Sequence, residues 1–114
     1  MAYAMIENLE QQSIVNIQKQ LDKIDNGVTE ASKVREMVSK ATVSLSYVGE
    51  EDVMTMNPPI IGETICHVSI GQMREVAVWG KGQSQKRQQV SVVLGGDHRV
   101  IDGASAARFT STWR

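Results

Sequence analysis

One histidine in the chain has the surroundings of a general base. His98 lies in the stretch GGDHRVIDGASAARF (95–109), directly between Asp97 and Arg99. The two glycines before it and the Asp102-Gly pair after it predict a tight turn between a strand and a helix, with Asp102 in the turn or capping the helix. An imidazole held in one tautomer on such a turn can remove a proton near neutral pH. A turn that is merely hydrogen-bonded explains the same residues, and their spacing leaves both interpretations open.

The other residues with reactive side chains have simpler explanations. His67 shares a predicted strand face with Ile65 and Ser69, which favours a structural or surface role. Cys66 is the only cysteine, so no internal disulfide can form and a reducing compartment is expected. No basic residue adjoins Cys66 to activate its thiol, so we expect a buried apolar residue rather than a nucleophile. One cysteine and two distant histidines give no zinc spacing, and GKGQSQ (80–85) lacks the ending of a phosphate loop.

The elements that would position these residues begin with two helices. Apolar residues at helical spacing predict a first helix from Ile14 to Ile24, capped by Ser13 and stopped by Asn26 and Gly27. A second helix is predicted over 29–40, with Thr29 as its cap and Val34 among the apolar residues of one face.

A sheet and a third helix are predicted to follow. Alternating apolar and polar residues predict a strand within 41–49, and further strands are expected at 60–71, 74–79 and 88–96. The polar stretch 80–89 is expected to be a turn between two of them. Helical spacing returns from Ala104. This order predicts an α+β fold with a mostly antiparallel sheet.

Composition limits what the chain can bind. The 114 residues make one small domain, which can bury about 65% of its extended surface on folding. Only 4% of residues are aromatic, so the core is aliphatic and thin, and burial against other subunits would stabilise it. A net charge of -1 provides no field that attracts nucleic acid or anionic lipid, and no apolar run approaches the roughly 20 residues that span a bilayer. We expect no nucleic-acid partner, no membrane partner and no targeting segment at the start.

Several motifs together resemble one family. DHRVIDGASAARF (97–109) resembles the DHRxxDGA signature of the dihydrolipoamide acyltransferase core domain of 2-oxo acid dehydrogenase complexes, and its HxxxDG part resembles chloramphenicol acetyltransferases. VSLSYVG (43–49) resembles the family's FTxSxxG strand, and the stretch with paired prolines (57–79) resembles the strand and hairpin that follow. The resemblance covers about residues 6–114. It implies that residues 1–114 are the C-terminal half of that core domain: an α+β, truncated chloramphenicol-acetyltransferase-like domain, with a mostly antiparallel sheet and helices packed on it, assembling as a trimer.

The resemblance also implies roles for three residues. His98 matches the general base that deprotonates the thiol of coenzyme A, Asp102 matches the residue that orients the site, and Ser46 matches the hydroxyl that stabilises the tetrahedral oxyanion. The interval of 52 residues between Ser46 and His98 is like that of the family. In the family the base and the hydroxyl come from neighbouring subunits of a homotrimer, and coenzyme A and lipoamide are the substrates, with no metal.

Two functions follow from the resemblance. Because the half of the domain that supplies much of the substrate channel is not in this chain, we expect a shortened domain used for trimerisation and assembly. It would belong to a core-associated subunit of a 2-oxo acid dehydrogenase complex, and the pyruvate dehydrogenase complex is the one we favour. Such a subunit would be similar to protein X, the noncatalytic dihydrolipoamide dehydrogenase-binding subunit. That subunit would recruit dihydrolipoamide dehydrogenase through regions outside this chain, in the mitochondrial matrix. The alternative is an active dihydrolipoamide acyltransferase with His98 as base, and the alternative location is a bacterial cytoplasm. An unrelated small binding module is the third and weakest interpretation.

Overall fold

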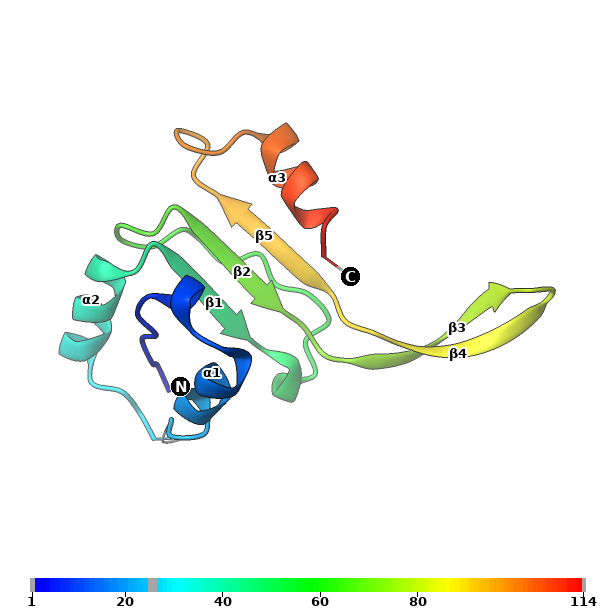
Figure 1. Cartoon of the computed structure of the whole chain (residues 1–114), viewed down its shortest axis with the longest axis horizontal. Coiled ribbons are helices and arrows are strands. Elements are labelled where there is room, and N and C mark those ends of the chain that lie inside the picture. The colour runs from blue at the N-terminus through cyan, green and yellow to red at the C-terminus, as the bar shows by residue number, and fades with distance from the viewer. Residues whose placement is uncertain (1, 25–26, 114) are drawn as a thin grey trace. The chain divides into compact units, whose positions relative to one another are not determined.

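A computed structural model describes residues 2–24 and 27–113, and the chain divides into two compact units, Met1–Ala41 and Thr42–Arg114. The first unit is helical (Figure 1). It contains a short 3-10 helix (Leu9–Gln11) followed by α1 (Ile14–Leu21) and α2 (Ala31–Lys40).

The first helix begins where the sequence predicts, and the cap of the second is different. The Ser13 hydroxyl accepts a hydrogen bond from the Asn16 backbone N–H at 3.2 Å, which confirms the predicted cap of α1. Helix α1 ends at Leu21 rather than Ile24, and Asn26, part of the predicted stop, lies outside the described residues. The predicted cap of α2 is wrong, because the Thr29 hydroxyl instead accepts a hydrogen bond from the Tyr3 backbone N–H at 3.0 Å.

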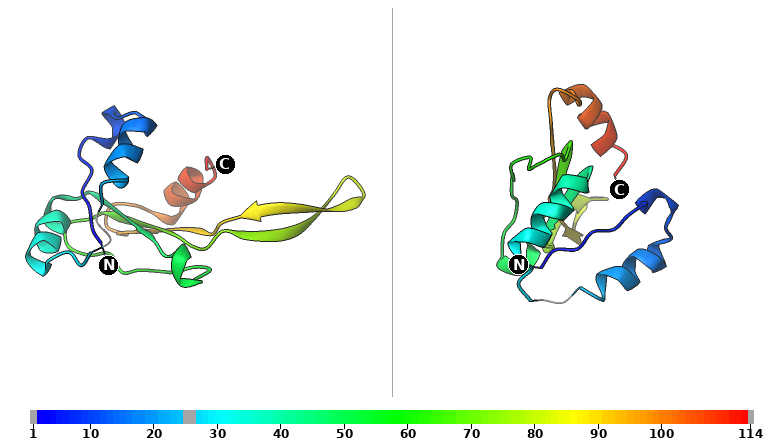
Figure 2. Two further views of the ribbon diagram at one scale, coloured as in Figure 1. Left: turned by 90° about the horizontal axis from the view of Figure 1, so that it is seen from below. Right: turned by 90° about the vertical axis from the view of Figure 1, so that its left-hand side faces the viewer.

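The second unit contains a three-stranded sheet, a separate hairpin and one helix. Its elements are β1 (Val43–Tyr47), a 3-10 helix (Gly49–Glu51), β2 (Cys66–Ile70), β3 (Arg74–Gly80), β4 (Gln83–Gln89), β5 (Val92–Gly96) and α3 (Gly103–Thr110). Strand β2 lies in the middle of the sheet, parallel to β1 and antiparallel to β5. Strands β3 and β4 form the hairpin, which extends beyond the end of this sheet (Figures 1 and 2). The α+β class with mostly antiparallel pairing is confirmed.

The stretch predicted as a polar turn is largely a strand. Residues 83–89 pair with β3 along its whole length, and the turn is only Lys81 and Gly82, with φ of 52° and 75°. Two consecutive residues with positive φ are typical of the tight hairpin turns that match strand twist. Cross-strand pairing therefore overrides the low strand propensity of this glutamine- and lysine-rich stretch. The predicted strand at 88–96 accordingly divides between β4 and β5.

The sheet has one polar and one apolar face. Register and alternation place Ser44 and Ser46 of β1 beside His67 and Ser69 of β2, and we call these four residues the polar face. The segment 56–60 covers this face: the Ser69 hydroxyl donates to the Met56 carbonyl oxygen at 2.5 Å.

The opposite face of the sheet is apolar. Val43, Leu45 and Tyr47 of β1 lie on it, and Leu45 is 62% exposed. Helix α3 contacts β5, and Ile101 lies against Gly96. Among the residues that the structure describes, Val48 is the one buried hydrophobic side chain. The core is therefore as thin as the composition predicts. No helix among the described residues has the length and apolar character needed to cross a membrane.

Candidate active site

The turn that carries His98 is held by its own backbone and by Asp97. The backbone N–H of Asp97 donates to the Ile65 carbonyl oxygen at 2.8 Å, which anchors the end of β5 to the segment before β2. The Asp97 carbonyl oxygen accepts from the N–H groups of Val100 and Ile101, both at 2.9 Å. The side chain of His98 is exposed. The sequence therefore predicts this strand-to-helix turn correctly, with the imidazole accessible to a ligand.

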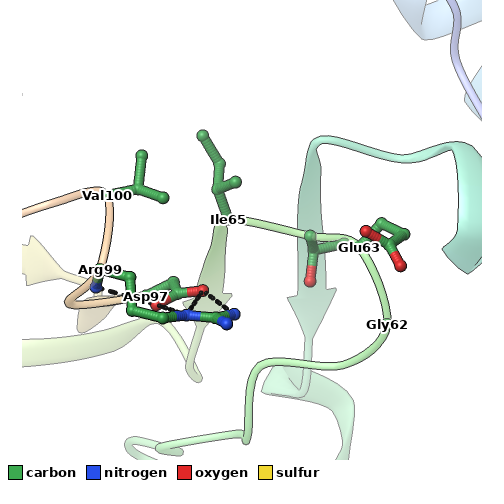
Figure 3. A pocket seen from close by; sticks show the side chains of 7 residues that line it. Gly62, Glu63, Ile65, Asp97, Arg99 and Val100 are labelled. Carbon is green, nitrogen blue, oxygen red and sulfur yellow. Dashed lines mark hydrogen bonds and ion pairs between the residues drawn. The ribbon is translucent and has the colours of Figure 1, made fainter.

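A short-range ion pair fixes the conformation of the turn. The Asp97 carboxylate accepts hydrogen bonds from the Arg99 backbone N–H at 3.0 Å and from Arg99 Nη2 at 2.7 Å. These bonds lower the pKa of Asp97 from 3.8 to about 2. Arg99 is thereby oriented along the turn, and neither charged group is free to bind an incoming ligand without giving up its partner (Figure 3).

The Asp97–Arg99 pair is expected to make stability depend on pH at the acid end. Because the pKa of Asp97 is lower in the folded chain, its contribution is complete above the unfolded value and is lost as pH falls through about 2. We expect Asp97→Asn to lower the free energy of unfolding at neutral pH, with the difference from the native chain shrinking below about pH 4. Urea unfolding at a series of pH values measures this.

A second acid provides the control for this measurement. Glu75 forms an exposed ion pair with Lys86 at 3.2 Å, so Glu75→Gln should change the free energy of unfolding by little at any pH. An Asp97→Asn difference that stays constant down to pH 2 would contradict the assignment of the acid-dependent stability to this pair.

Asp102 caps the helix that follows. Its Oδ1 accepts a hydrogen bond from the Ser105 backbone N–H at 2.6 Å, which confirms that Asp102 ends the turn as the cap of α3. This hydrogen bond is the main cause that lowers the pKa of Asp102. Asp102 and His98 therefore lie at the two ends of one short turn, and Asp102 fixes where the helix starts.

Ser46 lies elsewhere in the sheet. It is half-buried on the polar face, next to Ser69 of β2. Within the described part of the chain, its hydroxyl makes no side-chain hydrogen bond, so it can donate to a ligand. The neighbouring Ser44 hydroxyl, in contrast, is hydrogen-bonded to His67.

One chain does not bring Ser46 and His98 together. Strands β1 and β5 lie on opposite sides of β2, and β5 runs against the other two (Figure 1). Ser46 pairs with Ser69, whereas the turn after β5 is bonded to Ile65, which directly precedes β2 and lies four residues before Ser69. At about 3.3 Å per residue and about 4.8 Å per strand, the two positions are roughly 16 Å apart. Within one chain the two groups are therefore too far apart to act on the same bond.

A hollow of about 300 Å³ lies beside the His98 turn (Figure 3). Residues 62–65 line one side, and Asp97, Arg99 and Val100 line the other. His98, Ser46 and Asp102 do not line it. Three charged side chains line it, Glu63, Asp97 and Arg99. Because Asp97 and Arg99 already pair with each other, we do not assign a substrate site to this hollow.

The structure gives His67 a more specific place than the sequence does. Its side chain is 6% exposed, and its Nδ1 lies 2.6 Å from the Ser44 hydroxyl oxygen. Its Nε2 is buried and has no hydrogen-bond partner within residues 2–24 and 27–113. Burial lowers the pKa of His67. The predicted strand face shared with Ser69 is confirmed. The hydrogen bond to Ser44 could not be predicted from the sequence. The alternation in CHVSI indicates only that His67 lies on the face opposite the apolar residues.

The fold and this turn define a domain of the acyltransferase type. Residues 2–114 match the model of the family described as 2-oxoacid dehydrogenases acyltransferase (catalytic domain). The chain belongs to this family.

Relatives with known names agree with this assignment. The chain is 26% identical over 110 residues to the lipoamide acyltransferase component of the branched-chain alpha-keto acid dehydrogenase complex of Arabidopsis thaliana, covering 96% of this chain and 23% of that protein. It is 28% identical to the component of the same name from Caenorhabditis elegans, covering 96% of this chain and 25% of that protein. The chain thus spans about a quarter of the curated relatives it matches.

A solved structure allows a comparison of the site. The dihydrolipoamide acetyltransferase of Azotobacter vinelandii is 26% identical, with a TM-score of 0.73 over 93% of this chain and 44% of that one. A serine, a histidine and an asparagine were investigated for their roles in its catalytic mechanism. The histidine follows the serine by 52 residues, and the asparagine follows the histidine by 4.

Proposed function

We propose that this chain supplies the reacting groups of a dihydrolipoamide acyltransferase, which moves an acyl group from dihydrolipoamide to coenzyme A. The observation that carries the proposal is spacing. His98 follows Ser46 by 52 residues and Asp102 follows His98 by 4, the same intervals as in the Azotobacter vinelandii enzyme. Asp102 stands where that enzyme has an asparagine.

The proposed reaction needs one base and one oxyanion donor. His98 takes the proton from the thiol of coenzyme A, and the resulting thiolate attacks the carbonyl carbon of the acyl-dihydrolipoamide thioester. The Ser46 hydroxyl donates a hydrogen bond to the oxyanion of the tetrahedral intermediate. The bond from carbon to the dihydrolipoamide sulfur then breaks, and the leaving thiolate takes the proton from His98. The products are the acyl-coenzyme A thioester and dihydrolipoamide.

We further propose that the site forms between copies of the chain in a homotrimer. Two features support this: the roughly 16 Å between the positions of Ser46 and His98 in one chain, and the exposed apolar side chains of β1. An uncovered apolar strip of this kind on a sheet face favours a protein contact. Asp102 then acts through the helix start, holding His98 toward the neighbouring copy.

The second candidate is an assembly role without acyl transfer. In this proposal the domain joins the acyltransferase core, and the parent protein recruits dihydrolipoamide dehydrogenase through other regions, in the mitochondrial matrix or in a bacterial cytoplasm. The same exposed strip on β1 supports it, because self-association needs no chemistry at His98. We place transfer ahead of assembly because an assembly role alone does not require the three residues at the intervals of an enzyme.

An assay of the native full-length protein separates the two candidates. We expect it to form acyl-coenzyme A from acyl-dihydrolipoamide and coenzyme A, and to sediment as a trimer or a multiple of three. A trimer without transfer would favour the assembly role. A monomer with full activity would contradict the shared site.

A further inference from the structure

A buried imidazole stands beside the strand that carries Ser46. His67 is 6% exposed and pairs across the sheet with Ser44, two residues before Ser46 on the same face. The 2.6 Å contact between His67 Nδ1 and the Ser44 oxygen adds a side-chain hydrogen bond to the backbone ladder. The proposed reaction does not use His67.

Strand β1 depends on this neighbour for its position. It is an edge strand, and within the described residues β2 is the one strand that pairs with it. Of the side-chain hydrogen bonds in the described part of the chain, the bond between Ser44 and His67 is the one that joins β1 to β2. An edge strand can open locally more easily than a central strand. Loss of this bond would therefore loosen the segment that holds Ser46.

We propose that His67, in its neutral form, is a positioning residue for Ser46: through Ser44 it holds β1 at the place where the oxyanion donor is needed. This inference rests on the proposed function, in which Ser46 is that donor. A hydroxyl that stabilises an oxyanion must be held to within a fraction of an ångström. A histidine that is hydrogen-bonded to Ser44, two residues before Ser46 on the same strand face, supplies that restraint.

The surroundings of His67 favour the neutral ring. Ser44 faces it from β1, Gly95 from β5, and Ser69 lies beside it on β2. On the same face, the Met56 carbonyl oxygen accepts from Ser69, and Ile60 and the Pro58 carbonyl approach Gly95. None of these groups carries a charge. Protonation would place a charge in this site and leave a hydrogen on both ring nitrogens, although Nε2 has no hydrogen-bond partner among the described residues. Acid should therefore loosen β1.

Hydrogen exchange on the full 114-residue chain tests the link without any assay of transfer. We expect Ser44→Ala and His67→Leu to speed amide exchange in residues 43–47 about five- to tenfold, which corresponds to one hydrogen bond of about 1 kcal/mol. Exchange in the hairpin, residues 74–89, should not change and serves as the internal control. His67→Asn keeps a polar atom near Nδ1 but cannot be protonated, so it should retain protection and remove the extra loosening of β1 in acid. Unchanged exchange in β1 after Ser44→Ala, or equal loss in the hairpin, would overturn the proposal.

Kinetics on the native assembly connect the link to catalysis. We expect Ser44→Ala and His67→Leu to lower kcat several-fold with KM nearly unchanged, and His67→Asn to restore most of kcat. If β1 loosens but kcat does not fall, His67 does not position Ser46 and the proposal is wrong. If the native protein transfers no acyl groups at all, the proposed function fails and the catalytic role of His67 fails with it. The exchange result still decides whether His67 holds β1.

Discussion

Replacement of His98 by alanine in the native assembly is expected to lower kcat for acyl transfer by about 10²- to 10⁴-fold, the usual contribution of a positioned general base. The remaining rate would come from substrate binding and from the Ser46 hydroxyl. Because His98 is exposed and the turn is held by backbone bonds and by Asp97, the substitution should leave folding and assembly intact. The measurement is the initial rate of acyl-coenzyme A formation at saturating substrates.

A conservative change four residues away provides the control. Asp102→Asn introduces the residue of the Azotobacter vinelandii enzyme and keeps an oxygen that can accept from the Ser105 N–H, so most of kcat should remain. A His98→Ala protein that keeps its rate within a few-fold of the native protein would exclude His98 as the base. Of the two candidate functions, that result would favour assembly over acyl transfer.

Mixing two inactive proteins tests whether the site is shared between copies. His98→Ala and Ser46→Ala proteins are each expected to be nearly inactive. If His98 of one copy acts with Ser46 of its neighbour, random assembly from an equal mixture restores about one quarter of the sites, because each site needs the intact residue from both sides. A mixture that stays as inactive as its components after subunit exchange would place both groups in one chain, against the strand order observed here.

The parts of the site that depend on local sequence were predictable. The Asp-Gly after His98 predicts a turn and a helix cap, and the structure contains both through bonds that span at most four residues. The two glycines before His98 are extended residues of β5 and not part of the turn. The alternation in 43–47 likewise predicts β1 and places Ser46 on the same face as Ser44. These patterns depend on backbone geometry alone, which the residue types largely determine.

The parts that depend on distant pairing were not predictable. Nothing in residues 83–89 marks a strand; β3 makes them one by supplying a partner for every residue. The parallel pairing of β1 with β2 and the contact between Ser44 and His67 bring together residues 23 positions apart. Strand propensity is dominated by such context, so a single sequence gives little information about it. The separation of Ser46 from His98 has the same origin, since only the strand order reveals it.

A glycine at the end of β2 is expected to be the most sensitive position for folding. A Cβ on Gly71 would lie 1.9 Å from the Met54 carbonyl oxygen, a backbone atom that cannot move aside as a side chain does. Hydrogen bonds also hold the two backbone segments, around Gly71 and around Met54, in place. The Gly71 N–H donates to the Ser91 carbonyl oxygen at 2.9 Å, and the Gln72 N–H donates to the Val53 carbonyl oxygen at 2.8 Å. We expect Gly71→Ala to lower the free energy of unfolding by about 3 kcal/mol, near the upper end for overpacking. Urea unfolding followed by circular dichroism measures it.

Gly103→Ala is the control that distinguishes steric crowding at Gly71 from the general effect of adding a methyl group to a glycine. Gly103 is the first residue of α3, and no atom of the part of the chain that the structure describes lies within 4 Å of where its Cβ would be. Gly103→Ala should therefore leave stability unchanged or raise it by about 0.5 kcal/mol, because alanine has less freedom to lose on folding and favours helix. If both substitutions cost the same, close backbone approach at Gly71 is not the cause. If Gly71→Ala alone destabilises the chain, the close approach of the Met54 backbone to the end of β2 is the cause.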